Sequence, residues 1–238
     1  MTYQVGIYSG GKLRTLYDLT GSEQFRYSKK VNGYGQFLLA IPRARAHAAL
    51  YERDALARVF RTHPCTGQMT GDGVFLLRLH DSVPGDYDGL VIAGYGPEWL
   101  LDGRIYDPDD DPLVANGYST KSGPVTSVMR EIVVEQCIAP ATRPERAIPG
   151  LAARPIYDTS APPCAVRREV SADTVLQVLD GLSKAHHTDF WCEFMGLDPV
   201  YGYPRFEFVT GRIGRDRSKQ SYPAGPYTYL TPLTGNLI

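Results

Sequence analysis

The sequence predicts an α+β fold that is rich in β-structure. Short apolar or alternating segments follow one another closely up to about residue 106, and this spacing indicates a barrel or sandwich rather than βαβ units. Two amphipathic helices are predicted in the second half, followed by another pair of strands. The composition agrees, because 24 Gly, 18 Pro and 16 Tyr are typical of a protein with many turns and large paired strands.

The clearest strand signal is the segment Phe25–Ile41, FRYSKKVNGYGQFLLAI. Its first residues alternate between aromatic and polar, which is the period of a half-buried strand. Asn32-Gly33 favours a type I′ turn, because such a turn needs positive φ at both central residues. Gly35 lies where a glycine bulge redirects a returning strand, and Pro42 ends that strand. We therefore predict a hairpin with a tight two-residue turn.

Other elements of the first half have simpler patterns. The Ala-rich segment Arg43–Tyr51 predicts one short helix. Residues 63–73, which are punctuated by glycine, predict a loop. Further strands are expected at Val5–Tyr8, Leu13–Leu19, Ala57–Arg61, Val74–His80 and Leu90–Ala93, and regular structure resumes at Trp99–Ile105.

A run of acidic residues and prolines, DPDDDP at 107–112, separates the halves and predicts a solvated hinge. Asp107, Asp109 and Asp111 have the spacing of the first half of a calcium loop. However, Pro112 stands where that loop needs glycine, and no bidentate Glu closes it. The hinge is therefore favoured over a calcium site.

The first amphipathic helix is predicted from Pro124 to Cys137, with Ser122 as its cap. A proline-rich, extended connection over residues 139–164 follows it. The face of this helix that should be buried consists of Val125, Val128, Met129, Ile132, Val133 and Gln136.

The second helix is predicted from Ala172 to His186, with Ser171 as its N-cap. A strand pair at Phe190–Met195 and Arg205–Val209 should follow, then a basic loop over 211–220 and a last strand at Tyr227–Leu230. The stripe of this helix that should be buried consists of Val175, Leu176, Leu179 and Leu182.

Composition excludes several broad classes of function. The net charge of −1 provides no general attraction for nucleic acid or an anionic membrane. The N-terminus has no apolar stretch of a secretion signal, and no run of about 18 apolar residues predicts a membrane span. Cys65, Cys137, Cys164 and Cys192 form no closely spaced pair, which favours reduced thiols in a protein assembled in cytoplasm over a zinc site.

Motifs of known reaction chemistry are absent from the sequence. It has no nucleophile elbow, no HExxH and no phosphate-binding loop. Glu98 and Asp102 have the spacing of one helical face and mimic a pair of glycosidase carboxylates, but a surface pair is the favoured interpretation. His186 and His187 point about 100° apart on a helix, so they favour a role at the helix C-terminus over a shared metal. No cofactor is predicted.

Two groups of basic residues raise the possibility of phosphate contacts. Aromatic residues are not interleaved with them as in a single-strand binding platform, so solvated faces or subunit salt bridges are favoured. The groups are Arg43, Arg45, Arg53, Arg58 and Arg61, and then Arg212, Arg215, Arg217 and Lys219.

Several stretches, in this order and spacing, resemble the siphovirus Gp37-like tail proteins, the baseplate hub or tail-tip subunits of long-tailed phages. The resemblance extends over nearly the whole chain, and it rests on the ordered set rather than on any one motif. The stretches are FRYSKKVNGYGQFLLAIP (25–42), DALARVFR (54–61), DGLVIAGYGPEWLLDGRI (88–105), SGPVTSVMREIVVEQC (122–137), SADTVLQVLDGLSK (171–184), FEFVTGRIGRDRS (206–218) and the final GNLI.

The resemblance implies β-barrel-like tube domains of the phage tail hub type. It implies a homotrimeric ring that closes the distal end of the tail tube of a virion, with genome DNA passing through its lumen. The implied partners are the distal tail or tail tube protein and tip, spike or fibre proteins, without a membrane. The expected domains are a tube domain at 1–106, a hinge, helix and arm at 107–170, and a partial second tube domain at 171–238. Annular pairing would use the hairpin residues Asn32, Gly33, Tyr34 and Gly35.

The chain departs from the family pattern at the final GNLI, because related proteins continue into more strands. We therefore expect either a minimal hub or a second barrel completed by a neighbouring chain. A non-enzymatic structural protein is the favoured function. The alternatives are a tail-associated cell-wall hydrolase or peptidase that uses Glu98 and Asp102 or the histidine pair, and a nucleic-acid-binding packaging chaperone.

Overall fold

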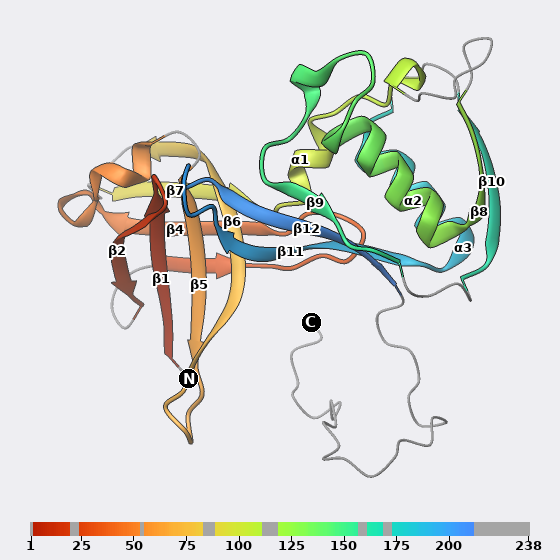
Figure 1. Cartoon of the computed structure of the whole chain (residues 1–238). Coiled ribbons are helices and arrows are strands. Elements are labelled where there is room, and N and C mark those ends of the chain that lie inside the picture. Colours follow the sequence, from red (N-terminus) through yellow and green to blue (C-terminus); the bar gives the residue numbers. More distant parts are fainter. Residues whose placement is uncertain are drawn as a thin grey trace.

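The computed structural model describes residues 2–19, 24–52, 55–82, 89–110, 119–156, 161–168 and 173–211. Within these residues the first part of the chain forms one large sheet. The second part combines a smaller sheet with two main helices and a separate pair of strands (Figure 1). The predicted α+β fold, rich in strands, is confirmed. No helix within the described ranges is long and apolar enough to cross a membrane.

The large sheet has seven strands, and every neighbouring pair in it is antiparallel. Its order is β2-β1-β5-β6-β7-β4-β3, so β2 and β3 are its edges. The strands are β1 (Thr2–Ser9), β2 (Lys12–Asp18), β3 (Gln24–Tyr27), β4 (Gln36–Pro42), β5 (Leu56–Thr62), β6 (Met69–Ser82) and β7 (Gly89–Tyr95).

This sheet is curled but not closed. The ring of Tyr3 in β1 lies 5.9 Å from Phe25 and 6.1 Å from Tyr27, although four strands separate β1 from β3 in the sheet. β1 and β3 therefore approach one another through side chains, while no strand pairing joins them among the described residues. The expected closed barrel is therefore wrong. Contacts between aromatic rings take the place of the backbone ladder that would close a barrel.

The sheet has apolar cores on both faces, and β6 contributes to both. Phe75 and Leu77 of β6 lie in the core inside the curl, together with Phe37 of β4. Leu76 and Leu56 point the other way and belong to the core beneath the helices. Side chains alternate across a strand, so a strand with an apolar layer on each side must be continuously apolar.

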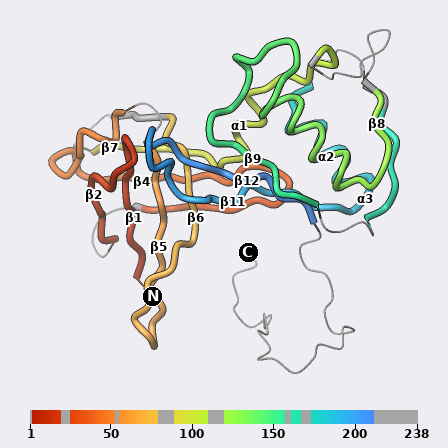
Figure 2. Tube along the Cα trace, in the orientation of Figure 1, coloured from red at the N-terminus to blue at the C-terminus, as the bar shows by residue number. Residues whose placement is uncertain are grey.

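The second part of the chain packs α2 and α3 against a three-stranded sheet of order β11-β12-β9 (Figure 2). In it β9 runs parallel to β12, whereas β11 and β12 are antiparallel. The elements are α1 (Trp99–Asp102), β8 (Ser119–Pro124), α2 (Val125–Val133), β9 (Leu151–Ala153), β10 (Pro163–Arg168), α3 (Val175–His186), β11 (Asp189–Leu197) and β12 (Pro204–Gly211), with β8 paired to β10.

Both predicted helices form, with shifted ends. The whole predicted apolar face of α2 is buried, and the chain continues from it into a π-turn at Val134–Ile138. The predicted cap Ser122 lies instead in β8. The stripe of α3 is buried as expected, but Thr174 is the N-cap and forms a capping box with Gln177. The predicted cap Ser171 lies outside the described residues.

Three local predictions in the first half are corrected. The segment Arg43–Tyr51 forms two separate 3₁₀ turns, Arg43–Arg45 and Ala48–Tyr51, rather than one helix. The predicted loop at 63–73 is shorter, because β6 already begins at Met69 and pairs with β5. The hairpin of β3 and β4 is confirmed, but its connection spans residues 28–35 instead of two residues.

The acidic segment at 107–112 is anchored at its start rather than free in solvent. The backbone N–H of Asp107 donates to Oε1 of Gln136 at 2.8 Å, and the amide of Gln136 donates back to the Asp107 carbonyl at 2.7 Å. The Asp107 carboxylate also pairs with Arg143 and Arg146. The chain then forms a 3₁₀ turn at Pro108–Asp110, while Asp111 and Pro112 lie outside the described residues. The expected domain boundaries stay predictions.

Candidate functional site

The two parts of the molecule meet at the outer edge of β11. This strand pairs with β12 on one side only, so its other side needs partners from elsewhere. The N–H of Phe190 donates to Oδ1 of Asn32 at 2.8 Å, and the N–H of Cys192 donates to Oε1 of Glu98 at 2.9 Å. Two side chains of the first part therefore satisfy successive edge donors of a strand in the second part.

Asn32 reaches β11 because of its backbone conformation. Its φ is +59°, in the left-handed region that Asn tolerates better than most residues. In this conformation its N–H donates to the carbonyl of Phe190 at 3.3 Å, and its side-chain amide donates to Asp189 at 2.9 Å. Gly33 does not have a positive φ, so the predicted type I′ turn is wrong.

The other residues of the predicted assembly hairpin lie around the same junction. Gly33 and Gly35 are buried, and the half-buried ring of Tyr34 meets Tyr95 at 5.5 Å. A Cβ on Gly35 would come within 2.1 Å of the Ser28 carbonyl, so the close approach requires glycine here. The role of these residues in pairing between subunits stays a prediction.

Glu98 is the most perturbed acid in the described part of the chain. It directly precedes α1 and is only 7% exposed. Burial raises its pKa from 4.5 to about 7, and the hydrogen bond from the Cys192 N–H only partly offsets this. Glu98 therefore exchanges its proton near neutral pH while it supports the edge of β11.

A groove of about 550 Å³ opens beside this junction. One wall is residues 71–75 of β6, another is residues 28–31 of the hairpin connection, and the third is residues 191–194 of β11. The remaining lining residues are Gly35, Arg58, Gly96, Pro97 and Glu98.

The carboxylates of the groove mostly have cationic partners. Asp72 accepts hydrogen bonds from the Tyr27 hydroxyl and from Lys29, and these contacts lower its pKa despite partial burial. Glu193 is bonded to Arg154, which likewise lowers its pKa. Two further cations, Lys30 and Arg58, also line the groove.

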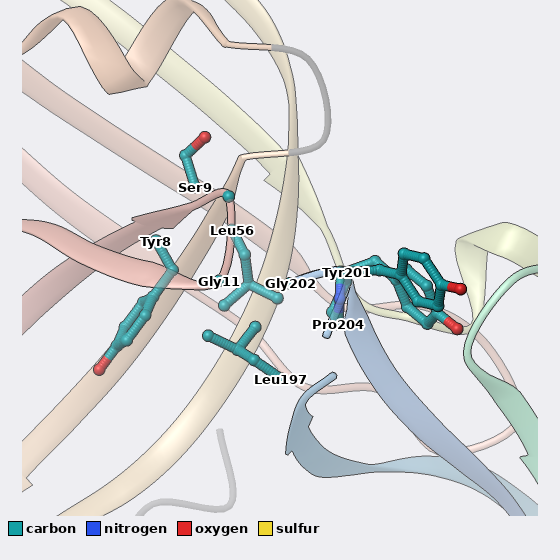
Figure 3. A pocket seen from close by; sticks show the side chains of 10 residues that line it. Tyr8, Ser9, Gly11, Leu56, Leu197, Tyr201, Gly202 and Pro204 are labelled. Carbon is teal, nitrogen blue, oxygen red and sulfur yellow. The ribbon is translucent and has the colours of Figure 1, made fainter. Parts of the chain in front are cut away.

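The two parts also touch at a second place, where two tight turns meet. Gly11 follows β1, Gly202 precedes β12, and both have a φ of +75°. A Cβ on Gly202 would lie 2.6 Å from the Gly11 nitrogen, so the two backbones are in direct contact. A small cavity of about 160 Å³ lies here, and Figure 3 shows the two glycines among its lining side chains, including Leu56 and Leu197.

The residues of the hydrolase alternative do not gather at one place in the groove. Glu98 lines it, whereas Asp102 accepts a hydrogen bond from Thr174 and lies outside its lining. His186 ends α3, and His187 follows in a left-handed conformation with a φ of +50°. The predicted position of the histidine pair at a helix C-terminus is confirmed. Within the described ranges no cluster of three or more His, Cys, Asp or Glu residues could hold a metal ion.

The basic residues and cysteines are dispersed. Arg43 and Arg45 are exposed on a 3₁₀ turn, whereas Arg58 lies in the groove. Arg53 and the second basic group from Arg212 onward lie outside the described residues, as does the predicted strand at 227–230. All four cysteines are free thiols.

Comparison with known proteins gives structural likenesses but no match of sequence. No protein family model matches the chain, and no curated protein sequence matches it. Among solved structures, the chain is similar to the 43 kDa tail protein of prophage MuSo2 from Shewanella oneidensis, with 12% sequence identity and a TM-score of 0.45. The match covers 89% of this chain and 56% of that one, so this chain spans little more than half the length of the tail protein it resembles.

Proposed function

We propose that this chain is a structural, non-enzymatic subunit of a phage tail. In its finer form, the proposal is a baseplate hub or tail-tip subunit that forms a trimeric ring at the distal end of the tail tube. The ring would join the tube or distal tail protein to the tip or spike. The ordered stretches that resemble siphovirus Gp37-like tail proteins motivate this assignment.

The observation that carries the proposal is the open edge of the seven-stranded sheet at β2. A strand at the edge of a sheet presents unpaired backbone groups and is a template for another chain. β2 also carries two large exposed apolar side chains, Leu13 at 50% and Leu16 at 42% exposure. An edge of this kind is suited to pairing around an axis with copies of the same chain.

The hydrolase alternative has less support in the geometry. Acid–base catalysis at Glu98 needs a second ionisable group within reach of the same substrate. The nearby carboxylates Asp72 and Glu193 are held by cations, and Asp102 lies outside the groove. A role in assembly uses the features that are present without requiring a further group.

The mass of the purified full-length chain in solution tests this proposal. We expect light scattering to give the mass of a trimer, either for the chain alone or after mixing with the distal tail or tube protein of the same phage. A strictly monomeric chain that binds neither tail protein would contradict the proposal.

A further inference from the structure

A short part of β6 lacks a strand partner on one side. Residues 69–76 of β6 pair with β5, whereas β7 pairs with β6 only from Leu76 onward. β7 ends at Tyr95, and Gly96 then bonds to the carbonyl of Gly35 instead of following β6. Residues 71–75 therefore pair with no described strand on the side that faces the groove.

The groove has the dimensions and the open backbone that an added strand needs. Five extended residues span about 17 Å, and β6 presents residues 71–75 along one wall of the 550 Å³ space. Gly71 leaves room for the Arg58 side chain, since a Cβ there would lie 2.8 Å from its guanidinium. Arg58 is therefore held against the open part of β6.

The charges around the groove select the chemistry of the occupant. Asp72 is paired with Lys29 and Arg61, and Glu193 shares Arg154 with Glu207. Lys30 and Arg58 also line the groove and have no acidic partner within the described ranges. Among the described residues the groove therefore has two cations available, and an acidic occupant complements them.

Arg58 is held in the position of a recognition residue. Its guanidinium lies 4.9 Å from the ring centre of Phe60 and 5.6 Å from that of Phe194. Stacking on aromatic rings fixes the plane of a guanidinium and leaves the N–H groups at its rim free to bind a carboxylate in a bidentate manner. The two rings come from β5 and β11, so the arginine is positioned by both parts of the molecule.

We propose that this groove binds an extended segment of a partner protein that carries an Asp or Glu side chain. The segment adds a strand to residues 71–75 of β6 and places its carboxylate on Arg58, with Lys30 as a second cation. The inference does not rest on ring formation, because the groove lies within one chain.

Labelled peptides of about seven residues, long enough to span the open part of β6, test this assignment on the full chain. The first probe alternates Thr and Glu, the second alternates Thr and Lys, and the third replaces the central Thr of the first by Pro, which removes an N–H needed for strand pairing. We expect fluorescence anisotropy to detect binding of the first probe and much weaker binding of the other two. Equal binding of the acidic and basic probes, or of the proline probe, would overturn the assignment.

Variants locate the site. Arg58→Ala and Lys30→Ala should each weaken binding of the Thr/Glu probe, Arg58→Ala by about tenfold or more because a charge-assisted hydrogen bond is lost. Arg26→Ala is the matched control, since Arg26 is an exposed arginine on β3 outside the groove lining. Lys30 is exposed, so its variant does not depend on the packing of Arg58.

Unchanged binding in both groove variants would contradict the proposal, and self-association abolished by Arg58→Ala would assign the groove to a second copy instead. A monomeric chain that binds the Thr/Glu probe would contradict the proposed ring but would support this binding site.

Discussion

Two residues, Asn32 and Glu98, join the two parts of the molecule through hydrogen bonds. Each supplies an oxygen to an edge N–H of β11, and these N–H groups belong to Phe190 and Cys192. A buried donor that loses its acceptor costs free energy in full, because water does not replace the partner. The two side chains therefore affect stability more than surface residues do.

Asn32→Ala tests the first contact. The variant leaves the Phe190 N–H without its acceptor and places Ala in a left-handed conformation that Asn tolerates better. We expect the free energy of unfolding to fall by about 2 kcal/mol. Urea titrations followed by tryptophan fluorescence measure it, since Trp191 lies in β11 itself.

Val31→Ala is the control for this change, because Val31 is the exposed neighbour of Asn32. It should alter stability by no more than about 0.5 kcal/mol. If the Asn32 and Val31 variants unfold at the same urea concentration, the contact with β11 contributes little and the account of the junction fails.

Glu98→Gln tests the second contact through its dependence on pH. In the folded protein Glu98 keeps its proton up to about pH 7, whereas the unfolded chain loses it near pH 4.5. The folded state then binds more protons between these values, so stability is full below about pH 4.5 and falls as pH rises to about 7. Gln retains an oxygen that accepts from Cys192 but does not ionise.

We therefore expect Glu98→Gln to be about as stable as the native chain at pH 4.5 and more stable by about 3 kcal/mol at pH 8. Urea unfolding at both pH values measures the difference. Glu145→Gln serves as the control, because Glu145 is exposed. If the free energy of unfolding depends on pH in the same way for the native and Glu98→Gln proteins, burial does not shift the pKa of this carboxyl.

At the scale of elements, the turns that carry Gly11 and Gly202 form a contact that only glycine permits. Gly202→Ala would force a Cβ against the Gly11 nitrogen, where it would lie at 2.6 Å, and would strain a φ of +75°. We expect a loss of about 2 kcal/mol or more in thermal or urea unfolding.

Gly181→Ala has the opposite expected sign and serves as the control. Gly181 lies within α3, and a Cβ there meets no atom within 4 Å. Replacing glycine inside a helix should stabilise the protein by about 0.5 to 1 kcal/mol. If Gly202→Ala and Gly181→Ala change the free energy of unfolding in the same direction, the contact between the turns does not make Gly202 a special position.

Elements with local signals were predictable from the sequence. The buried faces of α2 and α3 follow from a period of 3.6 residues, which is a property of each segment alone. β9 was not predicted, because its three residues become a strand only by pairing with β12, more than 50 residues later. The glycines at the start of β6 predict a loop, whereas the ladder with β5 holds them in a strand.

The candidate site was largely beyond prediction for the same reason. The turn signal at Asn32 is local, but its partner Phe190 lies 158 residues away. The spacing of Glu98 suggests a pair with Asp102, whereas Glu98 accepts a hydrogen bond from Cys192, 94 residues later. Nothing in the local sequence distinguishes a carboxyl that supports a strand edge from one on a surface, since burial by a distant element decides its pKa.

At the scale of the whole molecule, the curled sheet leaves its two edges to be completed. Contacts of Tyr3 with Phe25 and Tyr27 fill the curl, so β1 and β3 approach without a ladder between them. β2 lies outside β1 and remains an edge with two exposed leucines. Natural proteins rarely leave such an edge unprotected, and assembly with another chain is one way to cover it.

The double substitution Leu13→Lys and Leu16→Lys tests whether this edge holds subunits together. Both side chains are about half exposed in the single chain, so the charges should alter its own stability by only about 0.5 kcal/mol each. In an assembled ring they would be placed against another copy, where unpaired charges are strongly unfavourable. We expect light scattering to show the native chain as a trimer and the variant as a monomer that still unfolds cooperatively. Met195→Lys, at a similarly exposed position on β11, should leave the trimer intact. A variant that remains trimeric would remove β2 from the interface and direct the search to β3, the other open edge of the sheet.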